Sequence, residues 1–338
     1  MIDYFTTILT NVAVFGVIAI GLDVQWGWGG LLDLSYITFV AAGAYAYALA
    51  TLPAPGQGLH GSYLIGLHLP FVIGMVAGAL VAVALALVVG TIALRRIRPE
   101  YFAIVTLSVG LVIFQLVSQE YGLVNGQEGL FALPSPLLAA SWHGSLVGPQ
   151  LYLLWSLVWL LLAYVAARHV HDSPFGRTIR AVRDGEDAAS SFGYDAFGLK
   201  LRAFAVGAAF AGVGGALLAG YLTSYGTGAW TPSETFLLYV IVLIGGKGRP
   251  LGVVFGVLLI TGVLQEVTRF IPDIPGHPEA VAALRLIAIG VLMVLLLRWR
   301  PQGILPERPS RDAALGPARP STPAQTVGSH TAGTDHAA

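Results

Sequence analysis

The chain has 338 residues, no formal net charge and no cysteine, and only 11% of its residues are charged while 56% are apolar. A soluble globular domain carries roughly 25% charged residues, so this composition excludes an ordinary water-soluble fold. The absence of cysteine excludes disulfides and thiol chemistry, and the balanced charge offers no field to attract nucleic acid. Apolar runs of about 20 residues match the ~30 Å hydrocarbon core of a bilayer. The sequence therefore predicts an all-α polytopic membrane protein.

Apolar runs recur along the chain and predict about nine transmembrane helices, within a range of eight to ten. They cover residues 4–22, 31–51, 69–94, 101–119, 151–167, 199–222, 235–246, 251–269 and 281–298. The run at 235–246 is short and ends in two glycines, which makes it a candidate for a broken or half-crossing helix. We expect residues 1–306 to form the transmembrane domain. Residues 307–338 are rich in Pro, Ala, Thr and Ser and lack an apolar period, which predicts a disordered tail.

Lysine and arginine are distributed unequally over the predicted loops. When the nine spans alternate in direction, 16 of the 18 Lys and Arg residues fall on one side, together with the segment 168–202 and the tail. The loops at 52–68 and 120–150, on the other side, hold none. Cytoplasmic loops carry an excess of Lys and Arg, so we expect segment 168–202 and the tail in the cytoplasm and the N-terminus outside.

Segment 168–202 is a polar island between two apolar runs, and it carries 11 of the 36 charged side chains of the chain. Ser173-Pro174 is a helix start, with a capping hydroxyl and a proline in the first helical position. The helix that follows has an apolar face and a basic one. The apolar face is made by Phe175, Ile179 and Val182, and the basic residues are Arg177, Arg180 and Arg183.

A second short helix is expected over Gly185–Phe192, capped by Asp184 with Asp187 as its capping-box partner. Gly193 suits the end of that helix. Two capped helices with an apolar stripe favour an element that docks a partner on the cytoplasmic side. The alternative is a long loop that only bridges the gap between two spans.

Glycines interrupt the apolar pattern at Gly27–Gly30 and again at Gly245–Gly248. Such paired interruptions mark either inverted repeats around a central pathway or two ordinary turns. Asp33 follows the first interruption and is a candidate for lining a cavity. The full set of candidate pathway residues is Gln25, Gly29, Gly30, Asp33, Thr106, Gly245 and Gly246. The chain has no phosphate-binding Gly-x-x-x-x-Gly-Lys-Ser/Thr motif, so we expect it to bind no ATP itself.

The polar island resembles the cytoplasmic coupling loop of the branched-chain amino acid ABC importer permeases. Within it, Glu186-Asp187-Ala188-Ala189 followed by Gly193 is similar to the Glu-Ala-Ala…Gly signature of ABC importers, with Asp187 where the shorter signature has Ala. Further segments resemble the family in its own order over about residues 12–305. These are 21–35, 101–107, 125–130, 245–252 and 300–303. The match is to the longer of the two paired permease subunits.

The resemblance implies a permease domain in a bacterial-type inner membrane and no enzyme activity in this chain. The implied partners are two cytoplasmic ATPase subunits that hold ATP and Mg, a second paralogous permease, an extracytoplasmic solute-binding protein and the lipid bilayer. It also implies a set of residues that couple to the ATPase. That set is Phe175, Gly176, Arg177, Ile179, Arg180, Val182, Arg183, Glu186, Asp187, Ala188, Ala189 and Gly193.

Several residues depart from the family pattern, and they leave the substrate open. Lys247 and Arg249 stand where small or neutral residues are usual, Asn125 replaces a glycine, and Asp33 replaces a small polar residue. Branched-chain or other hydrophobic amino acids are the expected substrates, with urea, short amides or sugars as the alternative. An ion-coupled secondary transporter is a second alternative, although the interiors of the spans offer almost no ionisable residues for ion sites.

Overall fold

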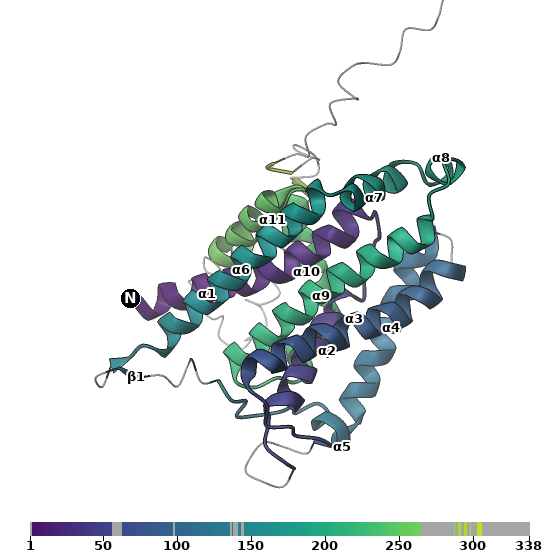
Figure 1. The fold of residues 1–338 in the computed structure, drawn as a ribbon. Coiled ribbons are helices and arrows are strands. Elements are labelled where there is room, and N and C mark those ends of the chain that lie inside the picture. The colour runs from purple at the N-terminus through teal and green to yellow at the C-terminus, as the bar shows by residue number, and fades with distance from the viewer. Residues whose placement is uncertain are drawn as a thin grey trace, which may run out of the picture. The chain divides into compact units, whose positions relative to one another are not determined.

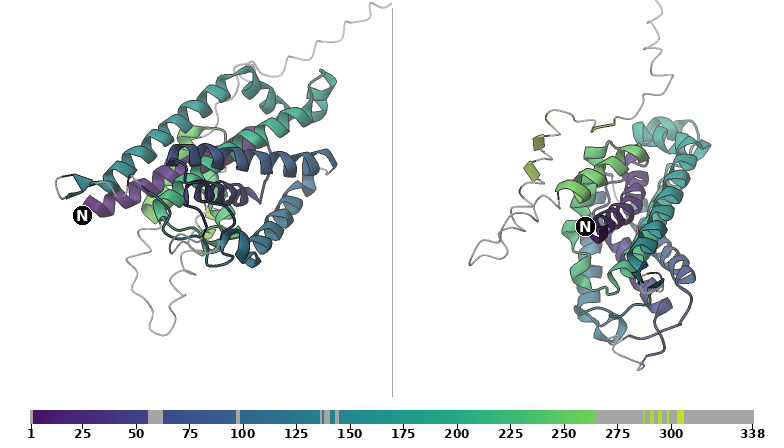
Figure 2. Two further views of the ribbon diagram at one scale, coloured as in Figure 1. Left: turned by 60° about the horizontal axis from the view of Figure 1, so that its bottom comes forward. Right: turned by 90° about the vertical axis from the view of Figure 1, so that its left-hand side faces the viewer.

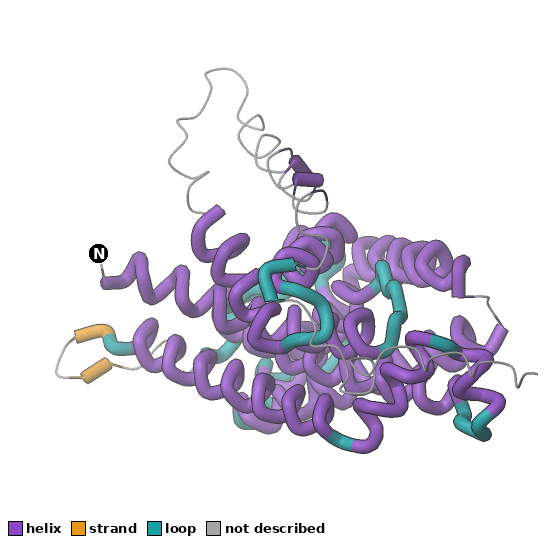
Figure 3. Tube along the Cα trace, turned by 90° about the horizontal axis from the view of Figure 1, so that it is seen from above, coloured by secondary structure: helices purple, strands orange, loops and turns teal. Residues whose placement is uncertain are grey.

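A computed structural model describes residues 2–55, 63–96, 99–135, 137, 141–142 and 145–264, with isolated positions from 287 to 305. The chain divides into two units, Met1–Glu307 and Arg308–Ala338, and the second lies outside the described residues, as does the predicted tail. The described part of the first unit is helical apart from a two-residue antiparallel pair, β1 (Ser141–Trp142) with β2 (Ser145–Leu146) (Figure 3). The predicted all-α class is therefore confirmed for this part of the chain, with that small hairpin as its exception.

Six helical segments in the described residues are long and apolar enough to cross a membrane. They contain α1 (Ile2–Leu22) with the π-helix η1 (Asp23–Trp28), α3 (Phe71–Arg96), α4 (Pro99–Gln119), α6 (Gly148–Asp172), α9 (Ala196–Leu222), and the 3₁₀ turn η2 (Thr227–Ala229) with α10 (Pro232–Gly245). Two further helices are apolar but shorter than these six. They are α2 (Tyr36–Thr51) and α11 (Pro250–Val257), which continues as the π-helix η3 (Leu258–Leu264).

Eight of the nine predicted apolar runs thus coincide with apolar helices, and the chain is a multi-pass membrane protein. The ninth run, 281–298, lies outside the described residues except at isolated positions, so nine spans remain a prediction. Within the described residues the short run at 235–246 belongs to a helix that begins at Pro232. The four-residue helix α5 (Tyr121–Val124) lies in the loop after α4.

The boundaries differ most at the first glycine interruption. The first helix does not stop near Leu22 but continues as η1 to Trp28, and α2 begins only at Tyr36. The backbone between them leaves the helical conformation at Gly30, which has φ +68°. A few residues later, the Asp33 carboxylate accepts hydrogen bonds from the main-chain N and the hydroxyl of Ser35. We call residues 29–35 the helix break.

The centre of the bundle is built from α2, α3 and α9, which pack along small residues (Figure 1). A methyl group on Gly78 would lie 2.7 Å from the Gly43 oxygen, and one on Gly212 would lie 2.7 Å from the Gly78 oxygen. Helices in a membrane associate where small residues let their backbones approach this closely. On the other side of α9, α1 packs against α6 and α11 (Figure 2).

The loops assigned to one side of the membrane by the charge count meet at one end of the helices. Tyr63 pairs with Val124 and Leu130 pairs with Tyr225 in isolated bridges, which joins the segments before α3, after α4 and after α9. The short helices α7 (Pro174–Asp184) and α8 (Glu186–Ser191) lie at the opposite end from α5 (Figure 1). This grouping agrees with the predicted sides.

Candidate docking element and helix break

The helices α7 and α8 form the element that the sequence predicts in the polar island. The Ser173 hydroxyl accepts a hydrogen bond from Gly176 N at 3.2 Å, and Pro174 is the first residue of α7. This is the predicted helix start. Gly193 lies just after α8 with φ +85°, in the left-handed conformation that suits a glycine after a helix end. We call residues 173–194 the docking element.

The predicted start of the second helix is wrong by one residue. Asp184 is the last residue of α7, and Gly185 stands at the cap position of α8 without a side-chain hydrogen bond. The Asp184 carboxylate instead accepts a hydrogen bond from Arg183 Nε at 2.8 Å. The two helices are therefore joined by a glycine turn and not by a capping box.

The apolar stripe of α7 faces the membrane bundle. The side chains of Ile179 and Val182 are 0% and 1% exposed, and Phe175 is partly buried against the core. Gly176 is also buried, and a methyl group there would clash with the Val170 oxygen. The stripe therefore holds the docking element on its own chain, and these side chains offer a partner little direct surface.

The most exposed apolar surface of the docking element lies around the end of α8. Phe192 is 84% exposed and Tyr194 is 50% exposed, and they flank Gly193. Arg177, Asp187 and Ala188 are exposed too, whereas Ala189 is buried. Phe192 and Tyr194 are not among the residues predicted from the sequence. The available signal was two aromatic residues on either side of Gly193 within a polar segment.

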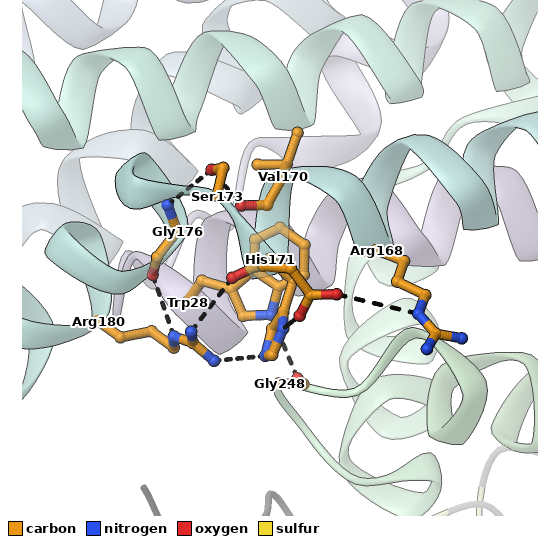
Figure 4. Close-up of polar contacts among 9 residues, drawn as sticks. Trp28, Arg168, Val170, His171, Ser173, Gly176, Arg180 and Gly248 are labelled. Carbon is orange, nitrogen blue, oxygen red and sulfur yellow. Dashed lines mark hydrogen bonds and ion pairs between the residues drawn. The ribbon is translucent and has the colours of Figure 1, made fainter.

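Arg180 ties α7 to the end of α6 (Figure 4). Its Nε donates to the Gly176 oxygen at 3.0 Å and its Nη2 donates to the His171 oxygen at 3.2 Å, while Nη1 meets the His171 ring nitrogen Nε2. The His171 ring in turn packs edge-on against Trp28, with 5.4 Å between the ring centroids. The docking element is thus connected to the end of η1.

Two further contacts attach the docking element to the bundle. Arg183 Nη1 donates a hydrogen bond to the Gly27 oxygen, and the Arg183 stem lies over Gly30, where a methyl group would come within 2.8 Å of Cγ. On α8, Glu186 forms an ion pair with Lys200 of α9, with 2.5 Å between Oε2 and Nζ. Contacts from α7 therefore reach the helix break, and a contact from α8 reaches α9.

The two glycine interruptions predicted from the sequence lie against each other. Asp23 Oδ1 accepts a hydrogen bond from Gly248 N at 2.6 Å, and Trp28 Nε1 donates to the Gly248 oxygen at 3.3 Å (Figure 4). A methyl group on Gly27 would lie 2.7 Å from Gly248 N. These contacts join segments 220 residues apart in the sequence. The interpretation of the two interruptions as inverted repeats stays a prediction.

Of the candidate pathway residues, Asp33 and Thr106 come together. Both are fully buried, and the Thr106 hydroxyl accepts a hydrogen bond at 3.1 Å from Leu34 N, next to Asp33. The Asp33 main-chain oxygen accepts from the Tyr239 hydroxyl at 3.0 Å. The helix break is therefore held between α4 and α10 by polar contacts inside the bundle.

The other candidate pathway residues have packing contacts. Gln25 Nε2 donates to the Phe204 oxygen at 2.8 Å on α9, and a methyl group on Gly29 would lie 3.5 Å from Ala203. Gly30 lies under the Arg183 stem. Gly245 packs on the backbone of Gly252, and Gly246 packs on Leu305. These glycines allow close backbone approach.

The described part of the chain holds no group of three His, Cys, Asp or Glu residues arranged to bind a metal. The apolar helices, with a polar break buried inside their bundle, define the class of a multi-pass membrane protein. The chain belongs to the family of permease components of branched-chain amino acid transport systems, whose model matches residues 4–297. The resemblance found in the sequence motifs is thereby confirmed, and this chain is a permease component.

Individual relatives agree with that family. The probable branched-chain amino acid transport permease protein LivM of Methanocaldococcus jannaschii is 27% identical over 336 residues, which cover 91% of this chain and 95% of the relative. The high-affinity branched-chain amino acid transport system permease protein LivM of Escherichia coli is 30% identical over 334 residues, covering 92% and 72%. A ribose import permease protein of Haemophilus influenzae is 25% identical over 300 residues, covering 86% and 84%. No solved structure shows significant similarity.

Proposed function

We propose that this permease carries branched-chain amino acids into the cell as the membrane-spanning subunit of an ATP-driven importer. The observation that carries the proposal is the family match over residues 4–297. The substrate class is supported by the relatives from M. jannaschii and E. coli, both described as branched-chain amino acid permeases and both covered over most of their length.

ATP and Mg belong to two cytoplasmic ATPase subunits in this proposal, and the docking element is the part that they grip. Exposed Phe192 and Tyr194 provide apolar anchors, of the kind that dominates binding energy in protein interfaces. Inward-facing Ile179 and Val182 keep the element fixed to the bundle. When the ATPase subunits close, α7 and α8 move as a body, and Arg183 and Glu186 pass that displacement to the helix break and to α9.

The remaining partners follow from the same importer organisation. A second, paralogous permease completes the membrane part in the inner membrane, and an extracytoplasmic solute-binding protein delivers the amino acid to the outer end of the helices. Selectivity is then shared between that binding protein and the membrane pathway.

The decisive test is uptake by the complete importer in proteoliposomes. Labelled leucine should enter only when the binding protein is outside and hydrolysable ATP reaches the ATPase subunits. Unlabelled isoleucine and valine should compete, whereas urea and ribose should not. Uptake driven by a proton or sodium gradient without ATP would establish the secondary-transporter alternative instead.

A sugar or small-amide permease is the second candidate function, because the ribose import permease relative covers 86% of this chain. Ribose or urea uptake without leucine competition in the same assay would favour it.

A further inference from the structure

We propose that branched-chain amino acids cross this subunit along the seam between α2 and α4, where the Asp33 carboxylate receives the substrate ammonium group on the inner side of a central constriction. The inference rests on the proposed function and assigns its route and its polar anchor. Two cavities along this seam and the closed space between them carry the argument.

The outer cavity has a volume of about 500 Å³ and lies between α2, α3 and α4. Its walls are almost wholly apolar, and they include Ala42, Ala46, Ala77, Val81, Leu116 and Val117. Pockets for small ligands have volumes of roughly 300–1,000 Å³ and mainly apolar walls. The cavity reaches Leu123 and Val124 of α5 at the outer end of the helices, so it suits a branched aliphatic side chain arriving from outside.

Thr38 and Trp230 line the inner end of this cavity and also line the next space along the seam. That space, bounded by Leu34, Leu107, Gly110 and Phe114 among others, has no room for a water molecule. The Phe114 and Trp230 rings meet edge-on across it, with centroids 5.2 Å apart. A methyl group on Gly110 would come within 3.1 Å of Ser35 Cβ. The seam is therefore closed at its centre.

A third cavity of about 140 Å³ lies on the inner side of the constriction. It is lined by Gly30, Leu31 and Leu32 of the helix break, by Phe102 of α4, and by Glu186 and Lys200. Residues 30–38 and the stretch of α4 from Phe102 to Phe114 thus connect the three spaces in order. The inner cavity also touches the docking element through Glu186, so movement of α8 can change its shape.

Asp33 and Thr106 lie beside these spaces without lining them. Asp33 follows Leu32, which lines the inner cavity, and precedes Leu34, which lines the constriction. Asp33 is fully buried, and its Oδ1 atom accepts hydrogen bonds from Ser35 N at 2.9 Å and Ser35 Oγ at 2.6 Å. The Thr106 hydroxyl also interacts with this carboxylate, but its Oδ2 atom has no hydrogen bond of normal geometry from the described residues. No Lys, Arg or His in that part of the chain pairs with it.

A buried carboxylate without a cation is costly in a membrane bundle. An amino acid supplies the missing charge, because its ammonium group is a cation and its branched side chain suits the apolar walls. Asp33 is therefore placed to recognise the group that distinguishes an amino acid from an apolar acid or an uncharged amide. The competing explanation is a protonated Asp33 with a purely structural role. In that case Asp33→Asn should transport leucine with an unchanged KM.

The first test uses the absence of cysteine from the chain. Ala77→Cys places a thiol on the wall of the outer cavity, whereas Ala84→Cys places one on an exposed position of the same helix outside that wall. Both reconstituted importers are treated with benzyl methanethiosulfonate. We expect labelling of Ala77→Cys to abolish leucine uptake and leucine with its binding protein to slow that labelling. Equal uptake by both labelled variants would overturn the route and leave the cavity as a lipid groove.

The second test replaces Asp33 by asparagine, which keeps the size and the ability to accept from Ser35. We expect the KM for leucine to rise at least roughly tenfold, because the substrate loses a hydrogen bond to a charged group. The ATPase activity should be retained. An unchanged KM would refute the ammonium site. If the unmodified importer carries no branched-chain amino acid, the proposed function fails and this inference fails with it. Leucine uptake that is insensitive to both changes refutes the inference alone.

Discussion

Arg183 of α7 donates a hydrogen bond to the main-chain oxygen of Gly27, and its aliphatic stem covers Gly30 of the helix break. One side chain thus joins the docking element to the non-helical backbone that carries Asp33. The contact needs a long side chain with a branched, permanently charged head. Gly30 also has to be glycine, because it has φ +68° and lacks room for a side chain.

Arg183→Ala should uncouple ATP hydrolysis from transport. The variant loses a hydrogen bond from a charged group, worth about 1.5–3 kcal/mol, so α7 can move without moving the helix break. We expect leucine uptake to fall at least roughly tenfold, while the ATPase activity of the complex persists. Arg202→Ala is the control, because Arg202 is an exposed arginine outside the docking element. Equal losses in both variants would mean that only positive charge at this end of the helices matters.

Phe192→Ala should weaken binding of the ATPase subunits without affecting the membrane fold. The side chain is 84% exposed and contributes no core packing, so its removal costs the protein itself little. As a central aromatic anchor it should contribute about 2 kcal/mol, or roughly 30-fold in affinity. The measurement is the dissociation constant between the detergent-solubilised permease pair and the ATPase subunits.

Phe5→Ala provides the comparison for that experiment, since Phe5 is an exposed aromatic residue near the N-terminus. Its removal should leave ATPase binding unchanged. Phe192→Ala binding with unmodified affinity would place the interface elsewhere on the docking element.

Local patterns in the sequence predicted much of the fold, because apolar length specifies a membrane span and caps specify helix ends. Ser173 and Gly193 stand where those rules place them. The direction of the Ile179 stripe was not predictable, since periodicity indicates that a face is buried but not what covers it. The contact between Asp23 and Gly248 joins residues 225 positions apart, and no local rule contains that pairing.

Gly43→Ala should destabilise the centre of the bundle. A methyl group at this position meets the backbone of Gly212 on α9, which cannot turn aside as a side chain could. Overpacking of a well-packed core typically costs about 1–3 kcal/mol, so we expect a lower midpoint of thermal unfolding in detergent. Gly228→Ala is the control, because no atom lies within 4 Å of a methyl group built there. Equal thermal midpoints for the two variants would show that α2 and α9 can separate at no cost.

Gly193→Arg should abolish uptake while the protein still inserts into the membrane. Gly193 has φ +85°, and a methyl group built there meets no atom within 4 Å, so the strain at this position comes from the backbone. A left-handed conformation costs an ordinary residue roughly 1–2 kcal/mol, enough to shift the short helix α8 and the exposed aromatic residues beside it. Gly185→Ala is the matched control, because Gly185 has a negative φ of −168° and a methyl group there only touches Ala188 at 3.7 Å. We expect membrane levels of both variants to equal those of the unmodified protein, with leucine uptake lost only in Gly193→Arg. Normal uptake by Gly193→Arg would remove the end of α8 from the ATPase interface.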